Sequence, residues 1–215
     1  MNKTKIEWAD STWNPISGCY HKCPYCYARA MVNRFSNVKI EDGNNQIITL
    51  DDPYIAANGK RLPYPWGFIP TFHRYRLNDF ATKSGRTIFV CSMADLFGEW
   101  VPDSWIKDVF DACENAPQHR YLFLTKNPSR YVKLVRAGLL PSRDNMWYGT
   151  TMTRPSEPFY FDQDRNTFIS VEPISGDFSN GVIIGQDNLD PIQHVDWVII
   201  GAETGRRKGK IVTKK

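Results

Sequence analysis

The sequence predicts an α/β protein in which a parallel β-sheet is covered by helices. Two observations favour this class. Short apolar segments alternate with amphipathic segments of helical period, and the apolar segments are nearly continuous rather than alternating with polar residues. Near-continuous apolar strands are typical of sheets that are buried on both faces, as parallel sheets are. The chain has 215 residues, 41% of them hydrophobic, and we expect one domain over 1–215.

Six strands are expected. One precedes Cys19, and the other five are apolar segments rich in β-branched and aromatic residues, at 87–91, 121–125, 146–151, 167–171 and 196–200. The first of these five follows a Ser-Gly turn. Since helical segments separate most of the strands, we expect neighbouring strands to run parallel.

Three helices are expected between these strands. One covers 102–116, where apolar side chains recur at helical spacing and Pro102 lies near the start. A second begins after Asn127, which is followed by a proline, and ends before Gly138, a typical residue just past a helix. The third begins near Tyr25 and has apolar residues at helical spacing. Its N-terminal N–H groups would favour an anionic group.

One long segment, 39–86, breaks the alternation of strands and helices. It is polar and rich in Gly, Pro and Asn, and we expect an irregular insertion with a functional role. It contains Phe72-His-Arg-Tyr-Arg76, with Arg61 and Trp66 nearby. Arginines interleaved with aromatic residues can neutralise phosphates and stack bases. The alternative is a surface loop whose aromatic side chains cover the domain.

Charge and hydropathy indicate the cellular location of the protein and the classes of partner that it can bind. No apolar run approaches the ~18–20 residues that span a membrane, and the charged start has no signal-peptide pattern, so we expect a cytoplasmic protein. The net charge of +4 comes from the last ten residues, which carry six basic side chains and no acidic one. The other 205 residues hold 21 basic and 23 acidic groups. The basic tail is either a solvated end or a phosphate-binding segment.

Three of the five cysteines lie within eight residues, in a C-x3-C-x2-C spacing formed by Cys19, Cys23 and Cys26. Without a secretory signal, such a group indicates a metal or redox site rather than a disulfide framework. Three thiolates on one loop can hold three corners of a 4Fe-4S cluster and leave the fourth iron open to a small molecule. The alternatives are a tetrahedral zinc site that includes His21, and three packed thiols without a metal.

The cysteine motif, with Tyr25 in its aromatic position, resembles the C-x3-C-x-aromatic-C signature of the radical S-adenosylmethionine superfamily. Further segments resemble a phage-associated family of unestablished reaction within that superfamily. They are 5–19, Ser92-Met-Ala-Asp-Leu-Phe97, Pro117-Gln-His, Leu124-Thr-Lys126, Val171-Glu-Pro173 and Gly201-Ala-Glu-Thr-Gly205. The resemblance covers nearly the whole chain.

The resemblance implies a partial (β/α)6 TIM-like barrel. Family members continue past the sixth strand with another helix, so it also implies a chain truncated at its C-terminus. The implied cofactors are one 4Fe-4S cluster and S-adenosylmethionine, with an external one-electron reductant. The methionyl group chelates the open iron, and reductive cleavage yields a 5′-deoxyadenosyl radical that takes a hydrogen atom from the substrate. A nucleic acid or nucleotide is the favoured substrate class. The alternative function is a non-catalytic zinc- or cluster-binding module that recognises nucleic acid.

Polar side chains follow most of the predicted strands, where the active site of a parallel barrel lies. The candidates at these ends are Ser92, Asp95, Lys126, Thr151, Glu172 and Glu203. The superfamily resemblance assigns Asp95 to the amino group of S-adenosylmethionine. The alternative for Asp95 is a turn cap.

Each remaining candidate has a possible role toward the cofactor or substrate and a structural alternative. Thr151 and Glu172 would accept hydrogen bonds from ribose hydroxyls, or cap loops and form salt bridges. Lys126 would bind a carboxylate or a substrate anion, or lie in solvent. Tyr25 would pack near the adenine, or simply on its helix. Cys91 would return a hydrogen atom to a substrate radical, or be a small buried residue, and Cys113 is expected in the core.

Overall fold

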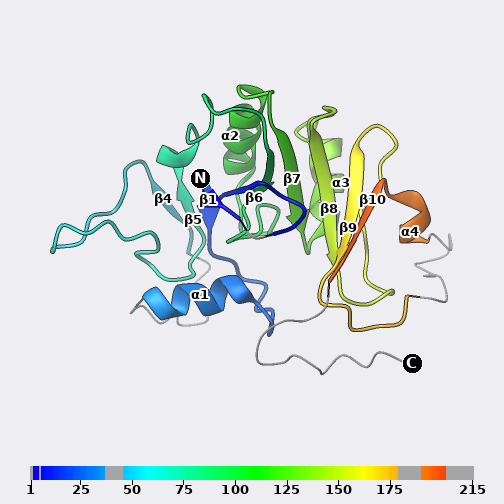
Figure 1. Ribbon diagram of the computed structural model, residues 1–215, viewed down its shortest axis with the longest axis horizontal. Helices are drawn as coiled ribbons and strands as arrows, with labels where there is room; N and C mark the ends of the chain where they lie inside the picture. Colours follow the sequence, from blue (N-terminus) through cyan, green and yellow to red (C-terminus); the bar gives the residue numbers. More distant parts are fainter. Residues whose placement is uncertain (1, 5, 37–45, 179–189, 202–215) are drawn as a thin grey trace. The chain divides into compact units, whose positions relative to one another are not determined.

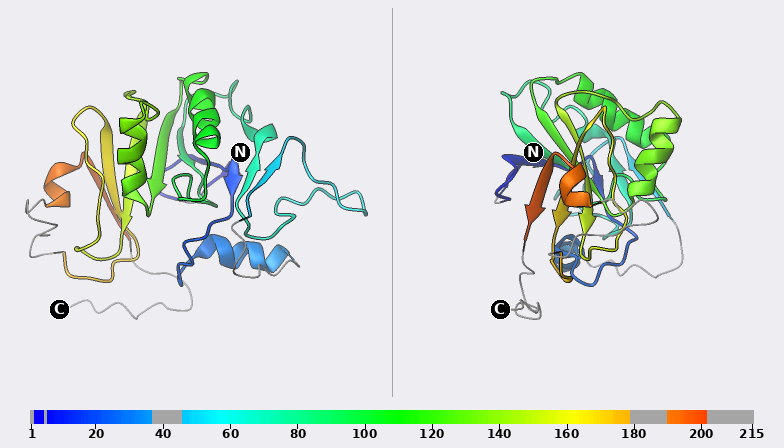
Figure 2. Two further views of the ribbon diagram at one scale, coloured as in Figure 1. Left: turned by 180° about the vertical axis from the view of Figure 1, so that it is seen from behind. Right: turned by 90° about the vertical axis from the view of Figure 1, so that its right-hand side faces the viewer.

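The computed structural model describes residues 2–4, 6–36, 46–178 and 190–201. It divides into two compact units, residues 1–123 and 124–215, which are described one at a time (Figures 1 and 2). Both units combine parallel strands with helices, so the α/β class is confirmed. Within the described residues, no helix has the length and apolarity needed to cross a membrane.

The main sheet of the first unit has the strand order β1-β2-β6-β7. These strands are β1 (Asn2–Lys3), β2 (Ser11–Trp13), β6 (Thr87–Val90) and β7 (Arg120–Thr125), the last two residues of which fall in the second unit. Strand β1 is antiparallel to β2, whereas β2, β6 and β7 are parallel. The predicted strand before Cys19 is therefore β2, and its pairing with β6 is long-range in sequence.

Helix α2 (Asp103–Glu114) packs against this sheet with the apolar face that the sequence predicts. Its buried residues are Trp105, Ile106, Val109, Phe110 and Cys113. The ring of Phe110 lies 5.3 Å from that of Phe123 on β7, edge to face. Figure 1 shows α2 beside β6 and β7. Cys113 is fully buried, as expected for a core residue.

The segment 39–86 is not irregular throughout, which corrects the sequence-based expectation. Its described part forms β4 (Ile48–Leu50) and β5 (Thr71–His73), followed by a short 3-10 helix, η1 (Arg74–Arg76). With β3 (Ile16–Ser17) they make a three-stranded sheet in the order β3-β5-β4. The strands escaped prediction because three residues are too few for a periodic pattern. Their pairing fixes them, with β5 antiparallel to β3 and parallel to β4.

Helix α1 (Tyr27–Phe35) follows the cysteine segment directly, close to the predicted start at Tyr25. Its buried side chains, Ala28 and Val32, form a small core with Phe68 and Met93. Met31, which shares the predicted apolar spacing, is instead 42% exposed. The helix is thus anchored by one narrow face to the same unit that carries the cysteines.

The second unit contains α3 (Pro128–Arg136) and the parallel strands β8 (Met146–Met152), β9 (Asn166–Val171) and β10 (Trp197–Ile200). A single helical turn, α4 (Pro191–His194), precedes β10. The predicted signals at Pro128 and Gly138 are confirmed, because Pro128 opens α3 and Gly138 adopts φ +67° just after it. Tyr131 of α3 packs against Tyr148 of β8, with their ring centroids 5.5 Å apart. The implied barrel concerns both units together and stays a prediction.

Candidate metal centre

The cysteine loop begins at Gly18, which is held between two segments of the first unit. Its N–H donates to the Met93 carbonyl at 2.9 Å, and the N–H of Cys19 donates to the Phe68 carbonyl at 3.2 Å. Gly18 has φ +85°, and an added Cβ would lie 2.3 Å from the backbone oxygen of Ile69. Only glycine fits this position, since both the backbone conformation and the space exclude a side chain. The position of Cys19 is therefore set by backbone contacts on both sides.

The three predicted ligands, Cys19, Cys23 and Cys26, are half-buried and are not joined in disulfides. Burial, and secondarily the Asp95 carboxylate, raises the pKa of the Cys19 thiol, and the charges of Cys23 and Cys26 act in the same direction. The N–H of His21 donates to Cys19 Sγ at 3.5 Å and partly offsets this rise. Cys19 thus lies within electrostatic range of the other two thiols.

Cys26 also starts helix α1. It is the N-cap residue, and its Sγ accepts a hydrogen bond from the N–H of Arg29 at 3.3 Å. The Arg29 side chain turns back to the loop, where Nη2 donates to the Cys19 carbonyl at 3.0 Å. The Nε of Arg29 is buried and has no hydrogen-bond partner among the described residues. A cation and a helix N-terminus therefore lie beside the thiols, which favours negative charge there.

Asp95 lies beside the cysteine loop but already has protein partners. Its Oδ2 accepts from Nε2 of His21 at 2.7 Å, and its Oδ1 accepts from the N–H of Phe97 at 3.0 Å. Only 5% of Asp95 is exposed. The turn-capping alternative is thus confirmed, and the assignment to a cofactor amino group stays a prediction. His21 further contacts Trp100, with their rings 4.9 Å apart.

The remaining candidates of the first unit lie around the same loop. Ser92 Oγ donates to Oδ1 of Asn14, and the Ser92 carbonyl accepts from the Tyr27 hydroxyl at 2.6 Å. Tyr25, within the motif, is half-buried. Cys91 is buried with φ +59°, and burial raises the pKa of its thiol to about 12. Its role as a hydrogen-atom donor stays a prediction.

Two candidates of the second unit, Thr151 and Glu172, lie at the carboxyl ends of the paired strands β8 and β9. Thr151 is in register with Ser170, whose hydroxyl donates to Glu172 Oε2 at 2.9 Å. Glu172 also extends over Gly201, where an added Cβ would meet its Oε1 at 2.2 Å. Lys126 is half-buried and precedes α3. Glu203 lies outside the described residues.

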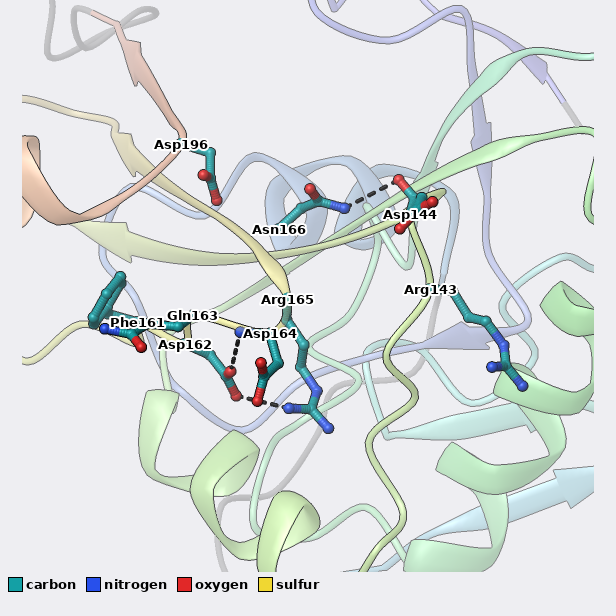
Figure 3. Close-up of a pocket in the computed structure, with 9 residues that line it drawn as sticks. All are labelled: Arg143, Asp144, Phe161, Asp162, Gln163, Asp164, Arg165, Asn166 and Asp196. Atoms are coloured by element: carbon teal, nitrogen blue, oxygen red, sulfur yellow. Dashed lines mark hydrogen bonds and ion pairs between the residues drawn. The ribbon is translucent and has the colours of Figure 1, made fainter.

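A polar cavity of about 290 Å³ lies at the opposite strand ends of the second unit (Figure 3). It contains none of the predicted residues and is lined by Arg143, Asp144, Phe161, Asp162, Gln163, Asp164, Arg165, Asn166 and Asp196. Two of its four carboxylates, those of Asp162 and Asp196, stabilise the fold through hydrogen bonds. Asp162 accepts from the Tyr160 hydroxyl at 2.5 Å and from Arg165 at 2.8 Å, and Asp196 Oδ2 accepts from the N–H of Thr167 at 2.7 Å.

The chemistry of the cysteine loop fits an anionic iron–sulfur group. It offers three thiols from one short loop, a helix N-terminus and the buried, unpartnered Nε of Arg29. As the side chains stand, the described residues contain no group of three or more His, Cys, Asp or Glu side chains arranged around a metal position. The three thiols remain the ligand set that the loop offers.

Sequence reasoning missed His21 as a partner of Asp95 and considered it only as a zinc ligand. It also missed Arg29, which links α1 to Cys19, and Trp100, which packs on His21 and has a buried Nε1 without a described partner. The only signal for His21 was its place inside the cysteine motif. No local pattern pairs it with Asp95, 74 residues away.

Comparison with known proteins assigns a family but no activity. A family model described as "Protein of unknown function (DUF5131)" matches residues 3–214, nearly the whole chain. No curated protein and no solved structure matches the chain significantly.

Proposed function

We propose that this chain, which belongs to the DUF5131 family, is a radical S-adenosylmethionine enzyme. The single observation that carries the proposal is the cysteine loop, which has Cys19, Cys23 and Cys26 within eight residues directly before α1. A three-cysteine set leaves one iron of a 4Fe-4S cluster without a protein ligand. When bound, the cluster and S-adenosylmethionine would supply a 5′-deoxyadenosyl radical for hydrogen-atom abstraction.

The chain's own residues would hold and shape this site. Gly18 and Arg29 fix the backbone of Cys19, and Cys26 couples the last ligand to the first turn of α1. Asp95 and His21 brace the loop between the first two cysteines. The cationic Arg29 and the helix N-terminus favour an anionic cluster electrostatically. The reductant would be an external one-electron donor.

The candidates of the second unit support a cofactor site of the same kind. Thr151 and Glu172 share one edge of a parallel sheet, and each carries oxygen atoms that can accept from ribose hydroxyls. In barrels the carboxyl ends of the strands carry the site. Their roles toward S-adenosylmethionine, like those of Tyr25, Ser92 and Lys126, belong to this proposal.

Anaerobic reconstitution with iron and sulfide tests the proposal. The protein should acquire about four irons and four sulfides with a broad brown absorbance. On reduction with S-adenosylmethionine, 5′-deoxyadenosine should form. A colourless protein that retains zinc and no iron would instead favour the alternative, a non-catalytic zinc-binding module. A cluster that forms without any 5′-deoxyadenosine would refute the enzymatic function and leave a cluster-binding module.

A further inference from the structure

A β-hairpin in the first unit presents arginine and aromatic side chains together. Ala57 and Asn58 form its turn, in which the N–H of Gly59 donates to the Ala56 carbonyl at 2.8 Å. Gly59 follows at φ +76°, and an isolated bridge pairs Ile55 with Arg61. Beside this bridge the N–H of Leu62 donates to the Tyr54 carbonyl at 3.0 Å. A turn that is followed by a glycine in the left-handed conformation is common in three-residue hairpin loops. Tyr54 and Arg61 belong to neighbouring residue pairs of this hairpin, and both are exposed.

Two arginines flank the ring of Tyr75. The guanidinium carbon of Arg61 lies 5.0 Å from the ring centroid, and that of Arg76 lies 5.4 Å away. Arg76 also donates to the Asn14 carbonyl at 3.0 Å. Arg61 has no hydrogen bond or ion pair with any other residue that the structure describes. Nearby Arg74, in contrast, is neutralised by Asp51.

The charges of these arginines act on two neighbouring groups, the buried His73 and the half-buried Tyr64. Burial, with the charges of Arg76 and Arg61 acting in the same direction, lowers the pKa of His73 to about 3. Arg76 also acts on Tyr64, opposing the rise in its pKa that burial causes. Two guanidiniums near each other without a described carboxylate between them favour an anionic ligand.

The same hairpin and the segment that follows it also carry aromatic surface. The rings of Tyr54 and Trp66 pack edge to face with centroids 5.4 Å apart. Tyr54 is 41% exposed, so part of its ring is open to a planar ligand. Bases stack on such side chains regardless of their identity, while arginines bind the phosphates between them.

We propose that Tyr54, Arg61, Trp66, Tyr75 and Arg76, here called the arginine–aromatic surface, bind a single-stranded nucleic acid. Arg61 and Arg76 would contact phosphates, and Tyr54 would stack a base. Alternating aromatic and cationic groups fit a strand better than one isolated phosphate, because each nucleotide offers one of each partner.

The surface is connected to the cysteine loop. Tyr64, which lies within the field of Arg76, packs on the core formed by Ala28, Phe68 and their neighbours, as Cys19 and Cys26 also do. That the bound strand is the substrate rests on the proposed radical function. Binding of the strand does not rest on the radical function, since none of the five residues is a proposed ligand of the cluster.

Fluorescence anisotropy with full-length protein tests the proposal. The probes are labelled oligothymidylate and oligouridylate of about 16 nucleotides, the upper site size of common single-strand modules. Binding should weaken steeply between about 50 and 200 mM salt. Arg61→Gln should weaken it by about 3- to 10-fold and reduce the slope of log affinity against log salt by about 0.7, the value of one phosphate contact on a single strand. Tyr54→Ser should weaken binding about 5-fold or more with an unchanged slope.

Lys107→Gln is the matched control, because Lys107 is an exposed cation of the same unit and is already paired with Asp111 at 2.6 Å. It should leave affinity unchanged. Equal affinities of the Arg61→Gln and Lys107→Gln variants, or no binding by the wild type at low salt, would overturn the proposal. Full competition by inorganic phosphate or a mononucleotide would also overturn it and indicate a small phosphate site. The Cys23→Ala variant should bind the strand normally, which separates this result from failure of the cluster proposal.

Discussion

His21 and Asp95 join the cysteine loop to the end of β6, with His21 Nε2 2.7 Å from Asp95 Oδ2. The histidine lies between two predicted ligands, and the aspartate is nearly buried. A contact between residues so far apart in sequence gives a short polar loop one defined conformation. Its value to the fold can be measured with paired substitutions.

A double-mutant cycle with His21→Phe and Asp95→Asn should show a coupling free energy of about 1.5–3 kcal/mol, the range for hydrogen bonds to charged groups. Phe retains the packing on Trp100, and Asn retains an acceptor for the Phe97 N–H. Urea unfolding of the four metal-free proteins under reducing conditions provides the measurement. Additivity of the two single effects would mean that the contact contributes nothing.

Gly18→Ala should destabilise the first unit by about 3 kcal/mol or more. The left-handed backbone alone costs ~1–2 kcal/mol for a residue with a Cβ, and the close Ile69 carbonyl adds a steric term. Gly59→Ala is the matched control, because Gly59 has a similar φ of +76° but no atom within 4 Å of an added Cβ. It should cost only ~1–2 kcal/mol. The two are compared by urea unfolding, and equal losses would exclude the steric contribution.

Single substitutions of Cys19, Cys23 and Cys26 by Ser should each remove most of the iron and sulfide acquired on reconstitution. Cys91→Ala and Cys113→Ala should retain them, since both residues are buried outside the loop. Iron and sulfide analysis of the five purified variants gives the comparison. Full occupancy in any loop variant would remove that cysteine from the ligand set.

The buried His73 predicts a loss of stability in mild acid. Its folded pKa, lowered to about 3 by burial and by Arg76 and Arg61, lies below the ordinary value of 6.5. Between these values the unfolded chain binds a proton that the folded chain does not, so the free energy of unfolding falls as the pH falls below about 6.5. At pH 5 the loss from this residue is about 2 kcal/mol.

The measurement is urea unfolding at pH 7 and pH 5, for the wild type and for His73→Gln. The variant lacks the titrating ring, so its loss between the two pH values should be smaller by about 2 kcal/mol. Identical losses would show that His73 binds its proton equally well in the folded and the unfolded protein.

Helices and strands with a clear local sequence signal were predicted from the sequence. The run from Asn127 through Pro128 to Gly138 marks both ends of α3, and the apolar spacing from Trp105 to Cys113 marks the buried face of α2. The ends and buried faces of these helices are determined by residues that are close in sequence. The predicted strand positions were likewise close to the observed ones, because buried parallel strands have a distinctive composition.

What the sequence could not predict depends on pairing between distant segments. Strand β5 is only three residues long and exists because β3 and β4 lie on its two sides. The cysteines were evident from their spacing, whereas the partners of Asp95 and the orientation of Arg29 follow from tertiary contacts. The three-stranded sheet was therefore not predicted, although the cysteine loop beside it was.

The order β3-β5-β4 makes the segment 46–76 indispensable to the loop that it adjoins. Ile16 and Ser17, directly before Gly18, have Phe72 and Thr71 as their strand partners, and Phe68 holds the N–H of Cys19. Shortening this segment would therefore release the first cysteine from its backbone contacts.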